Sequence, residues 1–168
     1  MSLWNVEDIN KISEKKINKN IIIADISINT RDLKKNSLFF AIKGERFDGH
    51  DFVIDAFKKG AAAAVVEKKK LDSFKDSFFS DKTLFVVNDS LSSLQKLAYL
   101  SRRRAKNLKM ICVTGSSGKT SVKNWLSKIL LNKKVHYTEG NLNNHIGLPL
   151  TSKNEKKFKV LYFGSWNE

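Results

Sequence analysis

The stretch Lys109-Met-Ile-Cys-Val-Thr-Gly-Ser-Ser-Gly-Lys-Thr-Ser121 decides the fold of this chain. Its first apolar residues, Met110 to Val113, are β-prone and predict a short strand that is buried on both faces. Gly115 and Gly118 then allow a tight turn, because glycine accepts backbone conformations that other residues avoid. A helix is expected from Lys119 onward, since apolar residues recur on one face: Val122, Trp125, Leu126, Ile129 and Leu130.

A strand, a glycine loop, a Lys-Thr pair and a helix are together the parts of a phosphate-binding site. Backbone N–H groups and the positive end of the helix attract the anion. Lys119 can reach the β- and γ-phosphates, and the hydroxyl of Thr120 can bind Mg²⁺. The usual motif has a glycine where this chain has Val113, so the loop is a shortened form, G-x-x-G-K-T. The alternative is a Gly/Ser turn beside an unrelated lysine, which the agreement of all four parts disfavours.

The chain is strongly basic, with 31 Lys and Arg against 17 Asp and Glu and a net charge of +14. Such a charge is typical of proteins that bind nucleic acid or an anionic membrane. However, only five of the basic residues are arginine, and no stripe of basic and aromatic residues stands out. We therefore interpret the lysines as solvated surface residues and expect neither nucleic acid nor membrane as a partner.

The sequence also indicates a compartment. No basic segment followed by an apolar one opens the chain, so no signal peptide is predicted. The longest apolar run, Ala61 to Val66, is far too short to span a bilayer. The single cysteine, Cys112, falls in the predicted buried strand and has no partner for an intramolecular disulfide. We expect a cytoplasmic protein.

Short strands and helices alternate through the first half of the chain. Asp51 is expected to begin a helix that Gly60 ends, and Asp89 or Ser90 to cap a helix that ends in Arg102–Arg104. The charged run 67–70 is interpreted as a solvated face, and 72–82 as a polar surface excursion. The predicted strands cover 21–28, 37–42, 61–66, 84–87, 135–137 and 158–163, and a short helix covers 6–12.

We place a domain boundary near Asp89, with a small α/β domain at 1–88 and the opening of a phosphate-loop α/β domain at 89–168. A complete domain of the second kind needs a parallel sheet with helices on both faces. Residues 109–168 have room for a strand, a helix and two more strands. The second domain is therefore expected to be incomplete, and the chain to be a fragment.

Three stretches of the chain together resemble the Mur ligases, the ATP-dependent amide-bond-forming enzymes of peptidoglycan precursor synthesis. They are 29–31 with 37–52, then 114–123, and finally the Asn-rich stretch 138–149. The likeness extends to about Leu150 and is greatest to the member that adds D-alanyl-D-alanine. The segments Gly-Glu-Arg-Phe-Asp at 44–48 and Gly-Asn-Leu-Asn-Asn at 140–144 favour that member over the diaminopimelate- or lysine-adding type.

The resemblance implies a three-domain ligase of which this chain holds the first domain and the start of the second. We also expect a monomer. The first domain would bind the UDP part of UDP-N-acetylmuramoyl-tripeptide, and the second would bind ATP with Mg²⁺. The peptide carboxylate would become an acyl phosphate, which the amine of D-alanyl-D-alanine attacks. Because the third domain is missing, this chain alone is expected to be inactive.

The resemblance also assigns residues. Lys119 is the catalytic residue, neutralising developing charge, and Thr120 is the metal ligand. The ATP loop comprises Gly115, Ser116, Ser117, Gly118, Lys119, Thr120 and Ser121. The substrate-binding set comprises Thr30, Arg31, Lys43, Gly44, Asp48, Gly49, His50, Asn141, Asn143 and Asn144. For the substrate set the alternatives are a plain turn, helix caps and a network of Asx turns.

The chain departs from the family pattern in two places. The family's next strand ends in Glu-x-Gly, whose Glu helps to hold the metal, whereas this chain has Tyr162-Phe163-Gly164. Asn29 stands where an acid often precedes the Ser/Thr-Arg pair. Two other classes remain as alternatives: a non-catalytic module that binds a UDP-sugar peptide or nucleotide, and a basic phosphate-loop protein acting on nucleic acid.

Overall fold

A computed structural model describes residues 4–75, 77–104, 109–111, 113, 116–130 and 160–161 of the chain. The chain divides into two compact units, Met1–Leu97 and Ala98–Glu168. The long helix α3 (Ser90–Arg104) begins in the first unit and ends in the second. The domain boundary expected near Asp89, at the start of this helix, stays a prediction.

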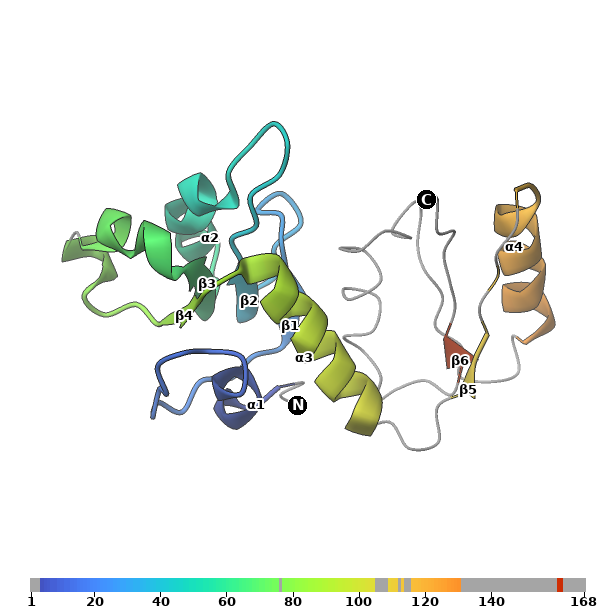
Figure 1. Cartoon of the computed structure of the whole chain (residues 1–168), viewed down its shortest axis with the longest axis horizontal. Coiled ribbons are helices and arrows are strands. Elements are labelled where there is room, and N and C mark those ends of the chain that lie inside the picture. Colours follow the sequence, from blue (N-terminus) through green and yellow to red (C-terminus); the bar gives the residue numbers. More distant parts are fainter. Residues whose placement is uncertain are drawn as a thin grey trace. The chain divides into compact units, whose positions relative to one another are not determined.

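Four parallel strands form the sheet of the first unit: β1 (Asp25–Ser27), β2 (Ser37–Phe40), β3 (Ala63–Glu67) and β4 (Leu84–Val87). Their order in the sheet is the order of the sequence, β1-β2-β3-β4 (Figure 1). Because all neighbours are parallel, every strand ends at the same edge of the sheet. We call this the carboxyl edge. The predicted α/β fold class with a parallel sheet is confirmed.

One face of the sheet packs against the helix α2 (Val53–Lys58) and the short 3₁₀ helices η2 (Lys68–Phe74) and η3 (Ser77–Phe79). The rings of Phe74 and Phe79 are buried in this core and meet edge to face, with centroids 5.1 Å apart. The expectation of a polar surface excursion at 72–82 is therefore wrong for these two residues. The cluster comprises Phe39, Ala41, Val53, Ala56, Ala64, Val66, Phe74 and Phe79.

The opposite face of the sheet is buried as well, because side chains alternate along a strand and Leu38, Phe40 and Val65 are fully inaccessible. The helices α1 (Val6–Asn10) and α3 supply further buried apolar residues: Ile9, Leu94 and Leu97. Burial on both faces explains why β2 and β3 carry almost continuous apolar runs rather than an alternating pattern.

The ends of the elements follow local signals. Asn5 caps α1 in a capping box with Asp8, and Gly60 follows α2 with a φ of +94°. Asp89 caps α3, since its Oδ1 accepts from the backbone N–H of Ser92 at 2.6 Å. The strand expected over 21–28 begins only at Asp25, because Ile23 forms an isolated antiparallel bridge with Trp4.

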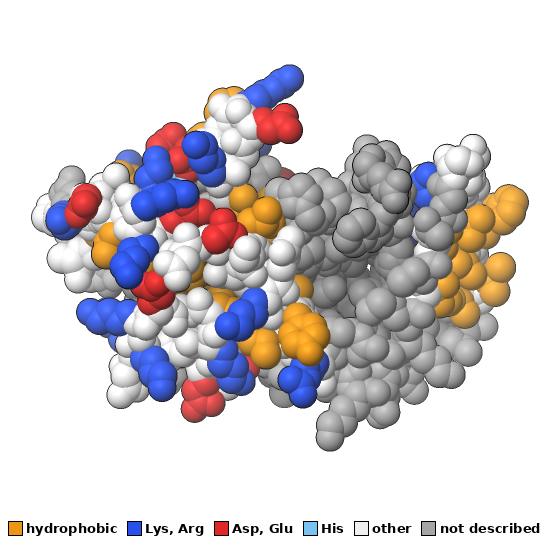
Figure 2. Space-filling model, in the orientation of Figure 1, with side chains coloured by type: hydrophobic (Ala, Val, Ile, Leu, Met, Phe, Trp, Pro, Cys, Tyr) orange, Lys and Arg blue, Asp and Glu red, His pale blue; other side chains and the backbone are white. Residues whose placement is uncertain are grey.

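In the second unit, β5 (Lys109–Met110) pairs in parallel with β6 (Val160–Leu161), and α4 (Lys119–Ile129) follows the glycine loop. The strand expected at 158–163 is present in shorter form, whereas the strand expected at 110–113 shares only Met110 with β5. Ile111 and Val113 lie outside a strand and are half-buried, so the expectation of a buried strand is wrong for these two residues. On α4 the apolar side chains of Val122, Trp125 and Ile129 are exposed (Figure 2). Cys112 and the strand expected at 135–137 lie outside the described residues. No helix in the described part is long and apolar enough to cross a membrane.

Candidate functional site

The predicted substrate residues of the first unit follow two neighbouring strands at the carboxyl edge. Thr30 and Arg31 come shortly after β1, and residues 43–50 come shortly after β2. We call residues 43–50 the substrate loop. Ligands of parallel α/β sheets commonly bind outside the carboxyl ends of the strands. The topology therefore gathers both predicted groups at the edge where a ligand is expected.

The turn after β1 is held to helix α2. Asn29 Oδ1 accepts from the N–H of Arg31 at 2.9 Å, which makes an Asx turn. Lys59 Nζ donates to the carbonyl of Thr30 at 3.1 Å and pairs with Asp55 at 3.1 Å. A hydrogen bond with the Thr30 side chain, and next the one with Lys59, lower the pKa of Asp55. Thr30 is therefore buried and engaged internally, whereas Arg31 is exposed.

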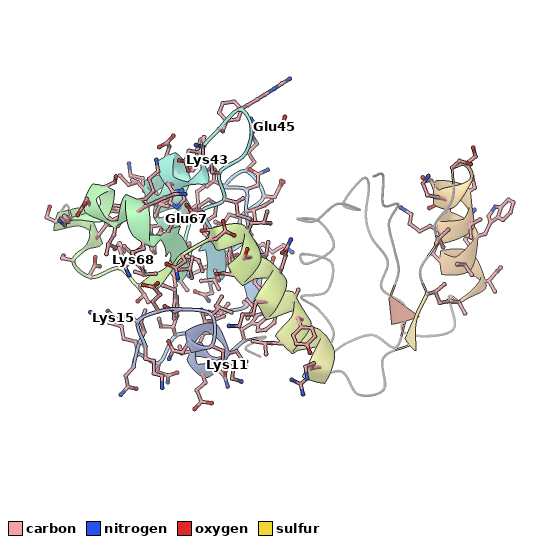
Figure 3. The ribbon with its side chains drawn as sticks, in the orientation of Figure 1. Lys11, Lys15, Lys43, Glu45, Glu67 and Lys68 are labelled. Carbon is pink, nitrogen blue, oxygen red and sulfur yellow. The ribbon has the colours of Figure 1, made fainter. Side chains whose placement is uncertain are left out.

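The substrate loop leaves and re-enters the sheet through backbone contacts. Lys43 and Asp48 form an antiparallel bridge, and the N–H of Gly44 donates to the carbonyl of Phe47 at 2.9 Å. Gly49 lies so close to Ile42 that a Cβ atom would fall 2.6 Å from both its N and its O. Only glycine fits there. Residues 43–47 are exposed, and Figure 3 shows Lys43 and Glu45 on this loop.

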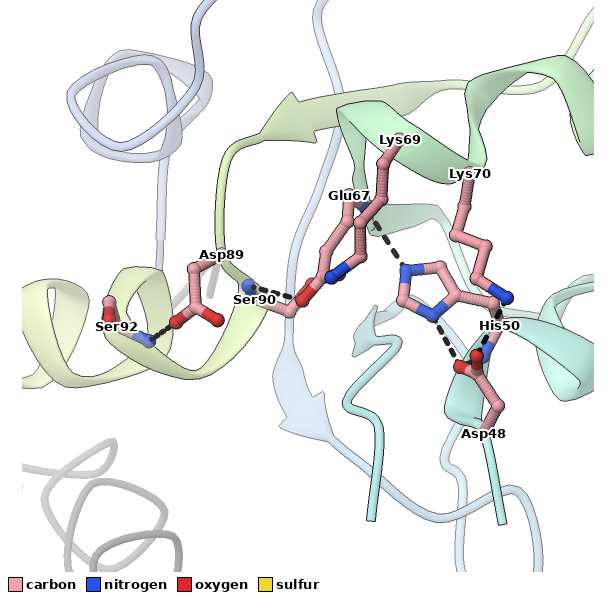
Figure 4. A network of polar contacts seen from close by, with 8 residues as sticks. All are labelled: Asp48, His50, Glu67, Lys69, Lys70, Asp89, Ser90 and Ser92. Atoms are coloured by element: carbon pink, nitrogen blue, oxygen red, sulfur yellow. Dashed lines mark hydrogen bonds and ion pairs between the residues drawn. The ribbon is translucent and has the colours of Figure 1, made fainter.

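His50 closes the substrate loop from inside the protein (Figure 4). Its Nδ1 lies 2.5 Å from Asp48 Oδ1, and its Nε2 accepts from the backbone N–H of Glu67 at 3.0 Å. Lys70 Nζ pairs with Asp48 Oδ2 at 3.0 Å. Burial alone would raise the pKa of Asp48, but hydrogen bonds from His50 and Lys70 outweigh it and hold that pKa well below its usual value. The assignment of His50 to the substrate-binding set stays a prediction.

Glu67, at the end of β3, is buried and connects two segments. Its Oε1 accepts from the backbone N–H of Ser90 at 3.3 Å, and its Oε2 pairs with Lys69 at 2.7 Å. The hydrogen bond with Glu67 raises the pKa of Lys69. The interpretation of residues 67–70 as a solvated face is therefore wrong for Glu67. The sequence gives one signal for its burial, which is that Glu67 directly continues an apolar strand.

The phosphate loop of the second unit is described from Ser116 onward. Gly118 has a φ of +77°, the left-handed conformation that favours glycine. The residues Ser116, Ser117 and Thr120 are exposed. Lys119 Nζ donates to the carbonyl of Ser116 at 3.2 Å, so this side chain folds back over the loop. Lys119 and Ser121 both belong to the first turn of α4, while Gly115, Asn141, Asn143 and Asn144 lie outside the described residues.

The start of α4 suits an anion. The N-cap residue of α4 is Gly118, which has no side chain to accept a hydrogen bond from the first N–H groups of the helix. The first turn also contains no acidic residue. The first backbone N–H groups of a helix lack intrahelical partners, and the helix dipole adds positive potential there. An anion at this point is therefore favoured. The Thr120 hydroxyl supplies an oxygen ligand of the kind that Mg²⁺ prefers.

Comparison with known proteins places these features in a family. Residues 22–111 match the family model described as "Mur ligase family, catalytic domain", and residues 113–163 match "Mur ligase middle domain". A UDP-N-acetylmuramoyl-tripeptide–D-alanyl-D-alanine ligase of Rickettsia prowazekii is 38% identical over 148 residues, and one of Bacillus subtilis is 41% identical over 133 residues. These alignments cover 87% and 77% of this chain and 31% and 27% of the relatives.

A third relative carries another name. The UDP-N-acetylmuramoyl-L-alanyl-D-glutamate–2,6-diaminopimelate ligase of Aquifex aeolicus is 37% identical over 110 residues, covering 65% of this chain and 21% of the relative. The chain therefore spans about a third or less of the length of the curated relatives it matches.

Solved structures agree with the sequence comparisons. MurF from Acinetobacter baumannii superposes with a TM-score of 0.81 at 28% identity, over 97% of this chain and 36% of that one. MurF ligase from Thermotoga maritima in complex with ADP gives a TM-score of 0.64 at 35% identity, over 82% and 30%. The family model alone covers more than half of the sequence. This chain belongs to the Mur ligase family.

Proposed function

We propose that this chain supplies the UDP-substrate site and the ATP-phosphate site of a ligase that adds D-alanyl-D-alanine to UDP-N-acetylmuramoyl-tripeptide. The observation that carries the proposal is the 38–41% identity to ligases of that name, across both the substrate loop and the phosphate loop. The diaminopimelate-adding type is the second candidate, because one such relative is 37% identical over a shorter stretch.

The proposed reaction has two steps. An oxygen of the peptide carboxylate attacks the γ-phosphorus of ATP and ADP leaves; the amine of D-alanyl-D-alanine then attacks the acyl carbon and phosphate leaves. Lys119 would neutralise the charge that develops on the transferred phosphoryl group, and residues 115–121 would bind the phosphates through their backbone. Mg²⁺, when bound, would offset charge between the anions, and Thr120 is the described residue that would hold it.

The substrate site is proposed at the carboxyl edge of the first unit. Exposed cations, Arg31 and Lys43, follow the adjacent strands β1 and β2, and the pyrophosphate of UDP is an anion that such side chains can pair with. Asn141, Asn143 and Asn144 are proposed to lie beside the phosphates and the substrate. We further propose that the protein is monomeric and cytoplasmic and binds neither nucleic acid nor membrane. On the face shown in Figure 2, basic and acidic side chains are interspersed, which supports the absence of a nucleic-acid stripe.

Isothermal titration of the 168-residue chain with UDP-N-acetylmuramoyl-tripeptide tests the proposal. We expect saturable binding that Arg31→Ala and Lys43→Met each weaken by about tenfold, the loss typical of a hydrogen bond to a charged group. Asp32→Asn serves as the control, because it neutralises a neighbouring exposed side chain without removing a cation. No binding of the wild-type chain would refute the substrate site.

The same titration separates the two candidate ligases. Tighter binding of UDP-N-acetylmuramoyl-L-alanyl-D-glutamate than of the tripeptide form would favour the diaminopimelate-adding type. ADP release is measured in parallel with ATP, Mg²⁺ and D-alanyl-D-alanine. We expect none, because the residues present correspond to about a third of each relative. Substrate-dependent ADP release would overturn that expectation.

A further inference from the structure

The substrate loop carries its functional residues on an exposed stretch that few contacts restrain. Residues 43–47 are exposed, and the backbone of the loop is closed on itself by the Lys43–Asp48 bridge and the Gly44–Phe47 hydrogen bond. The exposed ring of Phe47 packs edge to face on the ring of Phe52, with centroids 6.4 Å apart. A loop of this kind needs an anchor at its base if it is to hold one conformation.

The base of the loop has such an anchor in the carboxylate of Asp48. Its Oδ1 accepts from the backbone N–H of His50 at 3.0 Å and from the ring Nδ1–H at 2.5 Å. Its Oδ2 pairs with Lys70 Nζ at 3.0 Å, and Lys70 comes from η2, a separate segment beyond β3. Both oxygens are thus held, one from inside the substrate loop and one from outside it (Figure 4).

Both ring nitrogens of His50 take part in the same hydrogen-bond network as Asp48. Because Nε2 accepts from the N–H of Glu67, the proton of the neutral ring is on Nδ1, where it meets Asp48. The side chain is 3% exposed. Neither ring nitrogen has a hydrogen bond left to offer a ligand without breaking one of these contacts. The ring therefore links the substrate loop to the end of β3.

We propose that His50 and Lys70 are positioning residues for the UDP substrate: they fix Asp48, and through it they hold the substrate loop in its binding conformation. The inference rests on the proposed function, since it takes the loop to be a substrate contact. Lys70 lies in the charged run that the sequence presents as a solvated face, so nothing in the local pattern singles it out. A preorganised loop binds more tightly because only its competent population captures the ligand.

The first test replaces Lys70 by Met, which keeps the aliphatic stem and removes the charge. Amide hydrogen exchange at Gly44 and Gly49 should become about fivefold faster, near the upper limit for a partly exposed ion pair. The Kd for UDP-N-acetylmuramoyl-tripeptide should rise by up to about the same factor. Lys70→Arg should restore both values. Lys75→Met is the matched control, because Lys75 pairs with the exposed Asp72 and does not contact the loop.

The second test asks whether Lys70 acts through Asp48. In a double-mutant cycle, Asp48→Asn with Lys70→Met should be no worse than Asp48→Asn alone, since the pair is already broken. Additive losses of affinity would mean that Lys70 touches the substrate itself, and would overturn the proposal. So would unchanged exchange at Gly44 and Gly49 in Lys70→Met.

A third measurement addresses His50 directly. Nitrogen chemical shifts of its ring should show a proton on Nδ1 and none on Nε2, with and without the UDP substrate. A shift of Nε2 to a protonated or ligand-bonded state on binding would show a substrate contact instead. The exchange rates test the anchor in the absence of ligand. If the wild-type chain binds no UDP substrate while Lys70→Met still loosens the loop, the proposed function fails and the anchor stands.

Discussion

Among Gly→Ala substitutions at the described glycines of the first unit, Gly49→Ala should be the most destabilising. A Cβ at this position would lie 2.6 Å from the N and O of Ile42 and 3.1 Å from the carbonyl carbon of Ala41. Ordinary contacts of a Cβ atom begin at 3.4 Å, so the backbone must move by about 0.8 Å (3.4 − 2.6). The atoms in the way are main chain within a sheet connection, which cannot turn aside as a flexible side chain can.

Two costs add at this site. Overpacking against rigid neighbours typically costs about 1–3 kcal/mol. The displacement also lengthens the hydrogen bond from the Gly49 N–H to the Ile42 carbonyl, now 2.9 Å, which is worth about 1 kcal/mol. A total of about 3 kcal/mol corresponds to a fall in Tm of roughly 15 °C for a unit of this size.

Urea denaturation followed by circular dichroism measures the loss, with Gly44→Ala as the control. The Cβ of Gly44→Ala would meet only the carbonyl of Phe47, at 3.5 Å, so its free energy of unfolding should stay within about 0.5 kcal/mol of wild type. If Gly49→Ala is equally well tolerated, or if both glycines are equally sensitive, the close approach to Ile42 does not limit this position.

Three further predictions concern charged residues. Lys119→Met should weaken binding of a fluorescent ATP analogue by about tenfold or more, because a charge-assisted phosphate contact is lost. The urea midpoint should stay unchanged, because the residue lies at the start of α4, beside exposed loop residues. Equal affinity of the variant and the wild type would show that Lys119 does not contact the phosphates. Glu67→Ala should cost about 1–3 kcal/mol in urea denaturation, because the buried N–H of Ser90 loses its acceptor, whereas Glu67→Gln keeps one and should cost less. The pKa of Asp48 is lower in the folded state than its ordinary value of 3.8, so the unfolded chain binds more protons in acid. The stabilisation is therefore fully present above that ordinary value and is lost as the pH falls from it toward the folded-state pKa. Asp48→Asn should therefore flatten the fall of the urea midpoint between about pH 5 and pH 2, and an unchanged slope would argue against the carboxylate network.

Local patterns predicted the strands where the apolar run is closed by polar residues on both sides. β4 lies at 84–87 as expected, and β2 starts at Ser37 as expected. The strand over 21–28 was predicted too long, because Ile23 is drawn into a bridge with Trp4, nineteen positions earlier in the chain (23 − 4). A contact over that distance leaves no trace in the periodicity of either segment.

In the candidate site, too, local features could be predicted from the sequence and long-range contacts could not. The glycine loop with its Lys-Thr pair is a local motif, so its positive φ and its helix could be predicted from seven residues. The role of Glu67 could not, because its partner Ser90 lies beyond a further strand. The hydrogen bonds that occupy both ring nitrogens of His50 could not be predicted either, since only one of its two ring partners is close in sequence. Patterns reveal which residues are polar, and the fold decides which of them face each other.

The order β1-β2-β3-β4 has a consequence for how the chain acquires its structure. Each new strand joins the one made just before it, so no strand waits for a distant partner and each loop closure spans a short segment. On a ribosome, where the N-terminal part emerges first, the sheet can be assembled strand by strand. Since β4 ends at Val87 and the phosphate loop begins after Val113, the substrate edge can form before the residues that would bind ATP have emerged from the ribosome.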